Sequence, residues 1–339
     1  MLEDQRSIRE WVGKSKRSGS GALHIEKIPG DASTRGYYRV RSGSTRMIAM
    51  RMHPFPDVGE RLPFLQVQRH LAGLGLRVPD VIDADPAQGL ILLADLGDET
   101  LLKQLEGVSR KREQLVWFKK AIDMLTSLQI KATRNKAPID AYGLYFDEDK
   151  LMWEVRFTIN YLYNGKLAPL LPADAAKRME AHFAHICRRL ASEPWVFTHR
   201  DYHSRNIMVH KDELYMIDFQ DARLGCCQYD LASLLRDSYY QLEEDLIYEL
   251  VDYYRVKMAR AGLAADGPRA IKHFEEIFDL MSIQRNFKAM GSFASFFMKR
   301  DDSRYVKFIG NTFENVRRNL FKFPEYDELR RLLFRYYYF

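Results

Sequence analysis

Three side chains in one stretch of this chain have the types and the spacing that phosphoryl transfer needs. Asn206 follows Asp201 by five residues and Asp218 lies twelve residues further on, all close to short apolar runs. A carboxylate can aim a hydroxyl group and accept its proton, while an amide oxygen and a second carboxylate can hold magnesium (Mg²⁺) on nucleotide phosphates. We therefore expect ATP and Mg²⁺ as cofactors, Asp201 as the catalytic residue, and Asn206 and Asp218 as metal ligands.

Candidate nucleotide-binding residues precede this stretch. Residues 30–38 combine a turn with hydroxyl side chains, so Ser33 and Thr34 could lie where backbone N–H groups meet phosphates. Arg51 ends a strand where a kinase normally has a lysine that pairs with a helix glutamate; it either contacts phosphate or is a solvated strand residue. Asp95, at the expected joint between two lobes, is a further candidate for binding the nucleotide.

One helix carries polar side chains on a face that is otherwise apolar. At about 100° per residue, the apolar stripe of residues 274–281 continues into three polar residues. These are Gln284, Arg285 and Lys288. Polar groups on a buried face need partners. Either a ligand supplies them, or the helix pairs internally with residues such as Glu154 or Asp230.

The elements that must position these residues change in type along the chain. A polar amphipathic helix comes first, and the region up to residue 95 then alternates like strands around one helix at 64–74. From about residue 100 the pattern is mostly helical. This order predicts an α+β, two-lobed protein-kinase-like fold, with a β-rich nucleotide-binding lobe over 1–95 and a catalytic and substrate-binding lobe over 96–339.

Composition excludes several classes of protein. The 339 residues carry a formal charge of +6, but acidic and basic residues are interleaved, and no lysine block indicates a nucleic-acid partner. Three cysteines make a disulfide framework unfavourable, and Cys226 and Cys227 lack the spacing of a zinc site. There is no apolar signal core and no run of about 18 apolar residues. We expect a soluble, cytoplasmic monomer that acts on a small molecule and has no membrane partner.

These motifs resemble the aminoglycoside-phosphotransferase-like small-molecule kinases over most of the chain. Protein kinases usually have lysine two residues after the catalytic aspartate, whereas this family usually has histidine, as His203 is here. The match continues through residues 217–221 and 229–232. By resemblance, Asp230 ties the loop to the next helix. His203 either contacts the substrate or is a packed histidine, and Asp221 either contacts the substrate or a metal or faces solvent at a strand end. Cys226-Cys227 depart from the family pattern, which often has an aspartate and a proline after the glycine.

Four segments resemble a subgroup of this family, the bacterial cell-wall amino-sugar kinases that phosphorylate the anomeric hydroxyl of N-acetylmuramate and N-acetylglucosamine. They are residues 30–33, 199–206, 218–221, and Gln284-Arg285 with Lys288 and Gly291. The subgroup also tends to lack the strand lysine. The resemblance implies a sugar kinase of peptidoglycan recycling, in which Arg285 or Lys288 meets the lactyl carboxylate. The alternatives are a kinase for choline, homoserine or an aminoglycoside, and a degenerate nucleotide-binding scaffold.

Overall fold

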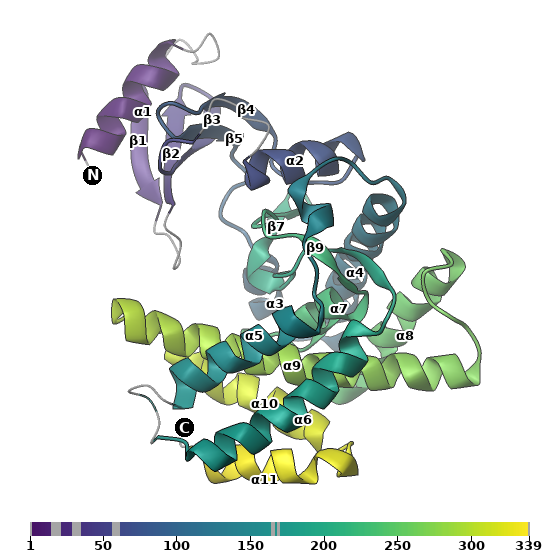
Figure 1. Cartoon of the computed structure of the whole chain (residues 1–339). Helices are drawn as coiled ribbons and strands as arrows, with labels where there is room; N and C mark the ends of the chain where they lie inside the picture. The colour runs from purple at the N-terminus through teal and green to yellow at the C-terminus, as the bar shows by residue number, and fades with distance from the viewer. Residues whose placement is uncertain are drawn as a thin grey trace. The chain divides into compact units, whose positions relative to one another are not determined.

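The computed structural model describes residues 2–14, 22–28, 35–55, 62–163, 167 and 170–337. They form two compact units, each described here by itself (Figure 1). The strand-rich unit contains residues 1–99 together with 208–220, and the helical unit contains residues 100–207 and 221–339. The segment 208–220 thus returns to the strand-rich unit from a distant part of the sequence.

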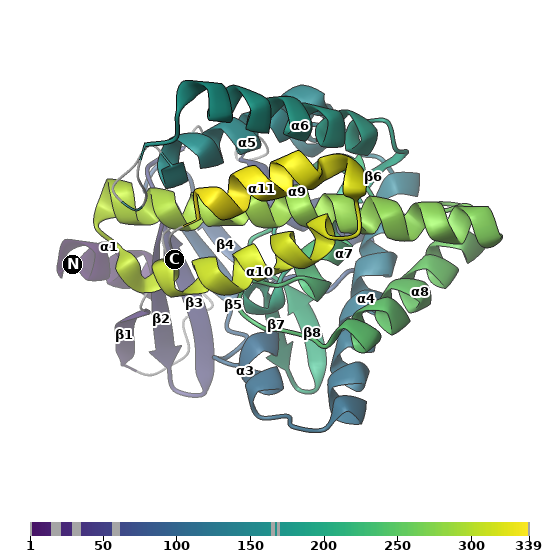
Figure 2. The same cartoon turned by 90° about the horizontal axis from the view of Figure 1, so that it is seen from below.

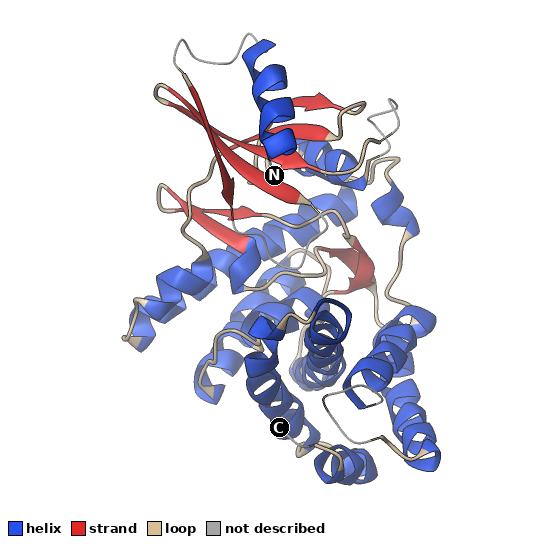
Figure 3. Cartoon of the chain, turned by 90° about the vertical axis from the view of Figure 1, so that its left-hand side faces the viewer, coloured by secondary structure: helices blue, strands red, loops and turns tan. Residues whose placement is uncertain are grey.

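The strand-rich unit is built on an antiparallel sheet of five strands in the order β1-β2-β3-β5-β4 (Figure 3). The strands are β1 (Leu23–Ile28), β2 (Gly36–Ser42), β3 (Thr45–Arg51), β4 (Val81–Asp85) and β5 (Leu90–Ala94). Gly43, with a φ of 57°, lies in the two-residue turn that joins β2 to β3, and this positive φ suits glycine.

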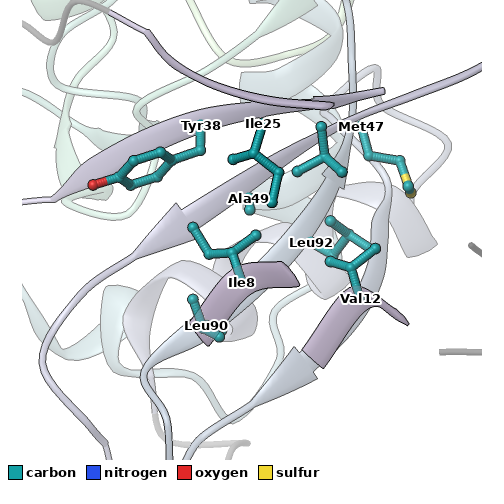
Figure 4. Packing of buried hydrophobic residues seen from close by; sticks show 9 residues of the cluster. Ile8, Val12, Ile25, Tyr38, Met47, Ala49, Leu90 and Leu92 are labelled. Carbon is teal, nitrogen blue, oxygen red and sulfur yellow. The ribbon is translucent and has the colours of Figure 1, made fainter. Parts of the chain in front are cut away.

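One face of this sheet is covered by the N-terminal helix α1 (Leu2–Lys14). Ile8 and Val12 of α1 pack in one cluster with side chains that alternate along three strands (Figure 4). Those strand residues are Tyr38 and Val40 of β2, Met47 and Ala49 of β3, and Leu90 and Leu92 of β5. Because side chains alternate along a strand, residue 51 of β3 belongs to this same α1 face.

The helix α2 (Pro63–Gly73) and the hairpin β7 (Ile207–His210) and β8 (Glu213–Met216) complete the strand-rich unit. The backbone N–H of Met216 donates to the carbonyl of Arg77 at 2.9 Å, and that of Val209 donates to the carbonyl of Glu99 at 2.8 Å. Phe219, just after β8, stacks on Phe64 of α2 with 5.1 Å between ring centroids. These contacts hold the returning segment in place.

The helical unit is assembled around α9, which is buried on most of its circumference, as expected for a central helix. Figure 2 shows α9 running between α5 and α6 on one side and α10 on the other. The helices are α3 (Leu101–Glu106), α4 (Lys111–Arg134), α5 (Glu148–Thr158), α6 (Ala173–Ala191), α7 (Gln228–Leu235), α8 (Glu244–Arg260), α9 (Pro268–Arg300), α10 (Ile309–Leu320) and α11 (Asp327–Arg335). Short helical turns span Asp140–Gly143, Ile159–Tyr163, Ser204–Asn206, Ser303–Phe308 and Pro324–Tyr326, and β6 (Trp195–Thr198) pairs with β9 (Arg223–Cys226).

The two helices that carry polar candidates have clear local signals. Asp147 caps α5 by accepting a hydrogen bond from the backbone N–H of Lys150 at 2.8 Å. Pro268 stands at the first position of α9, where its missing N–H removes no helical bond. No helix within the described residues is both long enough and apolar enough to cross a membrane.

The helices α5 and α9 approach so closely at Gly291 that no side chain fits there. A Cβ atom at this position would lie 2.6 Å from the Cα of Thr158 on α5. The hydroxyl of Thr158 in turn donates to the carbonyl of Phe287 on α9, at 3.1 Å. The two helices are therefore fixed against each other by backbone contact.

We expect Gly291→Ala to lower the free energy of unfolding by about 1–3 kcal/mol, because the added methyl group forces α5 and α9 apart. Thermal and urea denaturation measure the change. Gly143→Ala is the matched control, since its Cβ would meet nothing within 4 Å. Equal stability of the two variants would show that the helices adjust freely at this crossing.

Candidate active site

The loop between β6 and β7 is held at its start by one buried carboxylate. Asp230, in the first turn of α7, accepts hydrogen bonds from the backbone N–H groups of His199 at 2.7 Å and Arg200 at 2.9 Å. Arg200 has a φ of 83°, and this left-handed conformation costs a non-glycine residue about 1 kcal/mol or more. The bonds to Asp230 hold this turn, which presents Asp201. Asp230 thus ties the loop to α7, as the resemblance implies.

A second buried carboxylate holds the far end of the loop. Asp237, just after α7, accepts hydrogen bonds from the backbone N–H and the hydroxyl of Ser204, at 2.9 and 2.6 Å. Between the two clamps, the hydroxyl of Tyr202 donates to the carbonyl of Ala121 on α4 at 2.8 Å. Sequence reasoning missed Asp237. The signal was available, because an aspartate so close to the mostly apolar run 231–235 needs buried partners.

The carboxylate of Asp201 lies among cationic side chains of the same unit. Lys288 Nζ is 3.2 Å from Asp201 Oδ1, and Arg200 Nε is 3.7 Å from Oδ2. Burial opposes the negative charge, but Lys288 and Arg200 outweigh it and hold the pKa of Asp201 well below its ordinary value. Arg200 Nη1 also pairs with Asp221 Oδ2, at 2.8 Å. Asp201 is therefore ionised and able to accept a hydrogen bond from a hydroxyl group.

The side chains of Asn206 and His203 are ordered by one another and by the loop backbone. Asn206 Nδ2 donates to the carbonyl of Asp201 at 3.0 Å and lies 3.4 Å from His203 Nε2. Since an amide N–H only donates, Nε2 is the acceptor and the imidazole proton belongs on Nδ1. Burial, reinforced by Arg285, lowers the pKa of His203 to about 3, so the ring is neutral. These two contacts of the amide nitrogen order the side chain of Asn206 within the loop.

Asp218 follows β8 in the strand-rich unit. It has a φ of 63°, a conformation that aspartate tolerates better than most residues. Gln220 Nε2 donates to Asp218 Oδ1 at 2.7 Å, and the buried ring of Phe219 anchors the backbone between them. The turn therefore holds the Asp218 carboxylate in one orientation.

The donor atoms of Asp218 and Asn206 fit the preferences of magnesium. Mg²⁺ takes oxygen ligands, usually one or two carboxylates together with phosphate oxygens and water. No group of three His, Cys, Asp or Glu side chains that could hold a metal occurs among the residues described.

Internal pairing accounts for only part of the polar stripe of α9. Arg285 is 4% exposed, and within the described part of the chain its Nε and Nη1 have no hydrogen-bond partner. Lys288 pairs with Asp201, whereas Gln284 Nε2 donates to Glu154 Oε2 at 3.3 Å. A buried guanidinium with unused donors is costly unless an acceptor meets it.

Comparison with known proteins agrees with this chemistry. A model of the phosphotransferase enzyme family matches residues 24–267. The chain belongs to this family. It is 30% identical to the N-acetylmuramate/N-acetylglucosamine kinase of Pseudomonas aeruginosa, over 91% of this chain and 88% of that one. It is 29% identical to the protein of the same name from Neisseria meningitidis serogroup B, over 89% and 87% of the two chains.

Solved structures place the phosphotransferase in the protein-kinase-like fold. Choline kinase from Cryptosporidium parvum Iowa II matches with a TM-score of 0.64 over 98% of both chains, at 13% identity. An identity this low speaks for the fold alone. The α+β fold class and the resemblance to amino-sugar kinases that the sequence indicated are both confirmed.

Arg51 of the phosphotransferase lies on the α1 face of the sheet. Its Nε is 3.6 Å from Asp4 Oδ1, and its Nη1 donates to the hydroxyl of Ser7 at 3.3 Å, both on α1. Tyr37, which points to the opposite face, has a pKa raised by burial and further by the nearby carboxylate of Asp218. Arg51 therefore lies on the face of the sheet opposite to Tyr37. A contact between Arg51 and the nucleotide stays a prediction, now with a competing partner in Asp4.

Asp95 is engaged within the strand-rich unit. Arg39 contacts both of its oxygens, through Nε at 2.8 Å and Nη2 at 3.1 Å, and the backbone N–H of Gly97 donates to Oδ1 at 2.9 Å. These bonds fix the chain just after β5, and nucleotide binding by Asp95 stays a prediction. Ser33 and Thr34 lie outside the described residues, so their role also stays a prediction.

The cysteines that depart from the family pattern are buried and free. Burial raises the pKa of the Cys227 thiol to about 12, and that of Cys226 also rises. Gly225 before them faces Phe146, whose ring would be 2.8 Å from a Cβ atom. Cys226 ends β9 and Cys227 directly precedes α7, and both are buried packing residues with poorly acidic thiols.

Asp230 of α7 and His203 of the catalytic loop have opposite effects on how stability depends on pH. Burial raises the pKa of Asp230 to about 7, although the N–H groups of His199 and Arg200 lower it. The contribution of Asp230 is therefore full in acid and is lost as the pH rises towards 7. The pKa of His203, lowered to about 3, has the opposite effect. Its contribution is present above about pH 6.5 and is lost as the pH falls.

Asp230→Asn should make the phosphotransferase more sensitive to acid, because the variant loses the group that offsets His203. Its free energy of unfolding should fall more steeply than that of the wild type from about pH 6.5 to about pH 4. Urea titrations across this range measure the slope. Asp149→Asn, an exposed carboxylate on α5, is the control and should leave the slope unchanged. A shallower slope in Asp230→Asn would contradict the assigned direction.

Proposed function

We propose that this phosphotransferase moves the γ-phosphoryl group of ATP, with Mg²⁺, to the anomeric hydroxyl of N-acetylmuramate or N-acetylglucosamine. The observation that carries the proposal is the similarity, over about nine tenths of the chain, to two proteins named as kinases of these sugars. The proposal places the enzyme in the cytoplasm, as a monomer of peptidoglycan recycling.

Asp201 would aim the acceptor hydroxyl. In the loose transition state of phosphoryl transfer the hydroxyl loses its proton late, so orientation matters more than basicity. An aspartate held ionised by Lys288 and Arg200 suits this task. Lys288 would lie beside the reacting hydroxyl, where it also faces the negative charge of the phosphoryl group. Its bond to Asp201 makes Lys288 part of the proposed acceptor site.

The metal would be held by Asp218 through its carboxylate and by Asn206 through its amide oxygen. Bound magnesium would neutralise phosphate charge during transfer. The orientation of both side chains, by Gln220 and by the loop backbone, supports these assignments. Ser33 and Thr34 remain the proposed contacts to phosphate. The presence of all three residues Asp201, Asn206 and Asp218 disfavours a degenerate scaffold.

Charge around Asp201 favours a neutral or acidic acceptor over a cationic one. Lys288, Arg200 and Arg285 all lower the pKa of Asp201, so three cationic side chains would lie near the acceptor. Choline and aminoglycosides are cations that this arrangement would repel. We assign the unused donors of Arg285 to the lactyl carboxylate of N-acetylmuramate. His203 and Asp221 remain proposed contacts to the sugar.

A phosphoryl-transfer assay with ATP, Mg²⁺ and a panel of acceptors tests the proposed function. The wild type should phosphorylate N-acetylmuramate and N-acetylglucosamine, and not choline or kanamycin. Asp201→Asn should lower kcat by about 10²–10⁴-fold, because it removes the carboxylate while keeping the shape of the side chain. Turnover of choline or kanamycin alone would reject the substrate. Activity of Asp201→Asn within about tenfold of wild type would reject its catalytic role.

Arg285→Met should discriminate between the two sugars. We expect kcat/KM for N-acetylmuramate to fall by about 10–100-fold, the value of hydrogen bonds to a charged group, while N-acetylglucosamine, which lacks the lactyl carboxylate, is little affected. Thermal stability should not fall, because Nε and Nη1 of the buried guanidinium have no hydrogen-bond partner among the described residues.

The matched control is Lys288→Met, which should impair both sugars alike because Lys288 contacts Asp201 itself. Equal losses for both sugars in Arg285→Met would remove Arg285 from carboxylate recognition.

A further inference from the structure

A buried carboxylate and a buried amide on facing helices leave acceptor oxygens unused. Glu154 of α5 is 1% exposed, and its Oε2 accepts the hydrogen bond from Gln284 Nε2 on α9, at 3.3 Å. Its other oxygen, Oε1, accepts no hydrogen bond from any residue that the structure describes, and its ion pair with Lys150 Nζ, at 3.7 Å, is too long to be one. Gln284 is fully buried, and its Oε1 also has no hydrogen-bond donor. Burying such atoms without donors costs roughly 1–3 kcal/mol each.

These oxygens lie close to the catalytic carboxylate along one rigid helix. Gln284 and Lys288 are four residues apart on α9, a rise of about 6 Å, and contact Glu154 and Asp201 respectively. Tyr229 lies near both carboxylates, since burial and then Glu154 and Asp201 raise the pKa of its phenol. The Tyr229 hydroxyl is also buried without a hydrogen-bond partner.

We propose that Glu154 and Gln284 form a recognition site for hydrogen-bond donors of the acceptor, namely its hydroxyl groups or the N–H of its acetamido group. The inference rests on the proposed function and adds the residues that hold the sugar away from its reacting hydroxyl. A carboxylate next to a carbonyl oxygen takes donors and repels anions. The neutral, donor-rich part of the sugar belongs here, and any carboxylate belongs at Arg285.

Position on the two helices supports recognition of a ligand over a purely structural pair. The bond between Glu154 and Gln284 uses one oxygen of the carboxylate, and a structural pair would need no more. Gln284 Nε2 also donates to the carbonyl of Leu151 at 3.2 Å, so both amide hydrogens are used and only acceptor atoms remain. The close contact of α5 and α9 at Gly291 holds these acceptors in a fixed geometry.

Glu154→Gln tests the site while keeping the size of the side chain. We expect the KM for N-acetylglucosamine to rise about tenfold or more, because a charge-assisted hydrogen bond is lost, while the KM for ATP stays unchanged. Asp149→Asn makes the same charge change at an exposed position of the same helix and should leave both KM values as they are.

Deoxy analogues of N-acetylglucosamine, lacking the 3-, 4- or 6-hydroxyl, identify the group that Glu154 binds. For the wild type, we expect kcat/KM to be about tenfold lower with one of these analogues than with N-acetylglucosamine. For Glu154→Gln, we expect kcat/KM to be almost the same with that analogue and with N-acetylglucosamine. Gln284→Met should show the same loss of discrimination, which separates recognition from a folding defect of one variant.

Three outcomes decide the inference. An unchanged KM for N-acetylglucosamine in Glu154→Gln, with the wild type active on it, overturns this site and leaves the proposed function standing. A lower melting temperature with unchanged discrimination among the analogues also overturns it, because the pair is then structural. Absence of any amino-sugar turnover by the wild type overturns both proposals together.

Discussion

The geometry of the candidate site depends on two buried carboxylates at the ends of one short helix. Every residue of α7 is buried, so the helix is part of the core of its unit, and Asp230 and Asp237 lie at its two ends. Each accepts backbone N–H groups of the catalytic loop, one at its beginning and one at Ser204. The loop is thereby anchored to the buried core. The left-handed conformation of Arg200 is retained because the backbone N–H groups of His199 and Arg200 both bond to Asp230.

Electrostatic asymmetry follows from the same arrangement. Asp201 is ionised and His203 is neutral, and Lys288, Arg200 and Arg285 all contribute positive charge near Asp201. Partly desolvated cations of this kind reduce the stability of the fold unless bound anions neutralise them. A transferring phosphoryl group and an acidic sugar are anions of this kind. The helical unit should therefore be more stable with these anions bound than without them.

Features that depend on the spacing of residues within one segment could be predicted from the sequence. Features that depend on contacts between distant segments could not. The spacing from Asp201 to Asn206, the helix at 63–73 and the polar stripe of α9 follow from local pattern. The pairing of Arg51 with Asp4 does not, because it depends on α1 docking on β3 across more than forty intervening residues. Nor does the return of segment 208–220 to the strand-rich unit, and the predicted boundary at residue 95 stays a prediction. The pairing of Glu154 with Gln284 could not be predicted from local pattern for the same reason.

The helix α9 shows how one element can serve both as core and as site. Its circumference is buried almost throughout, so its position is set by packing against α5, α6, α7 and α10. Gln284, Arg285 and Lys288 project from this fixed rod, and their separations are therefore set by the rise of about 1.5 Å per residue. A mobile loop could not hold three polar groups at such constant spacing. In the proposed enzyme, the catalytic loop supplies the reacting carboxylate, and α9 supplies the polar groups that bind the rest of the acceptor at fixed separations. Selectivity for the acceptor should therefore reside in α9 rather than in the loop.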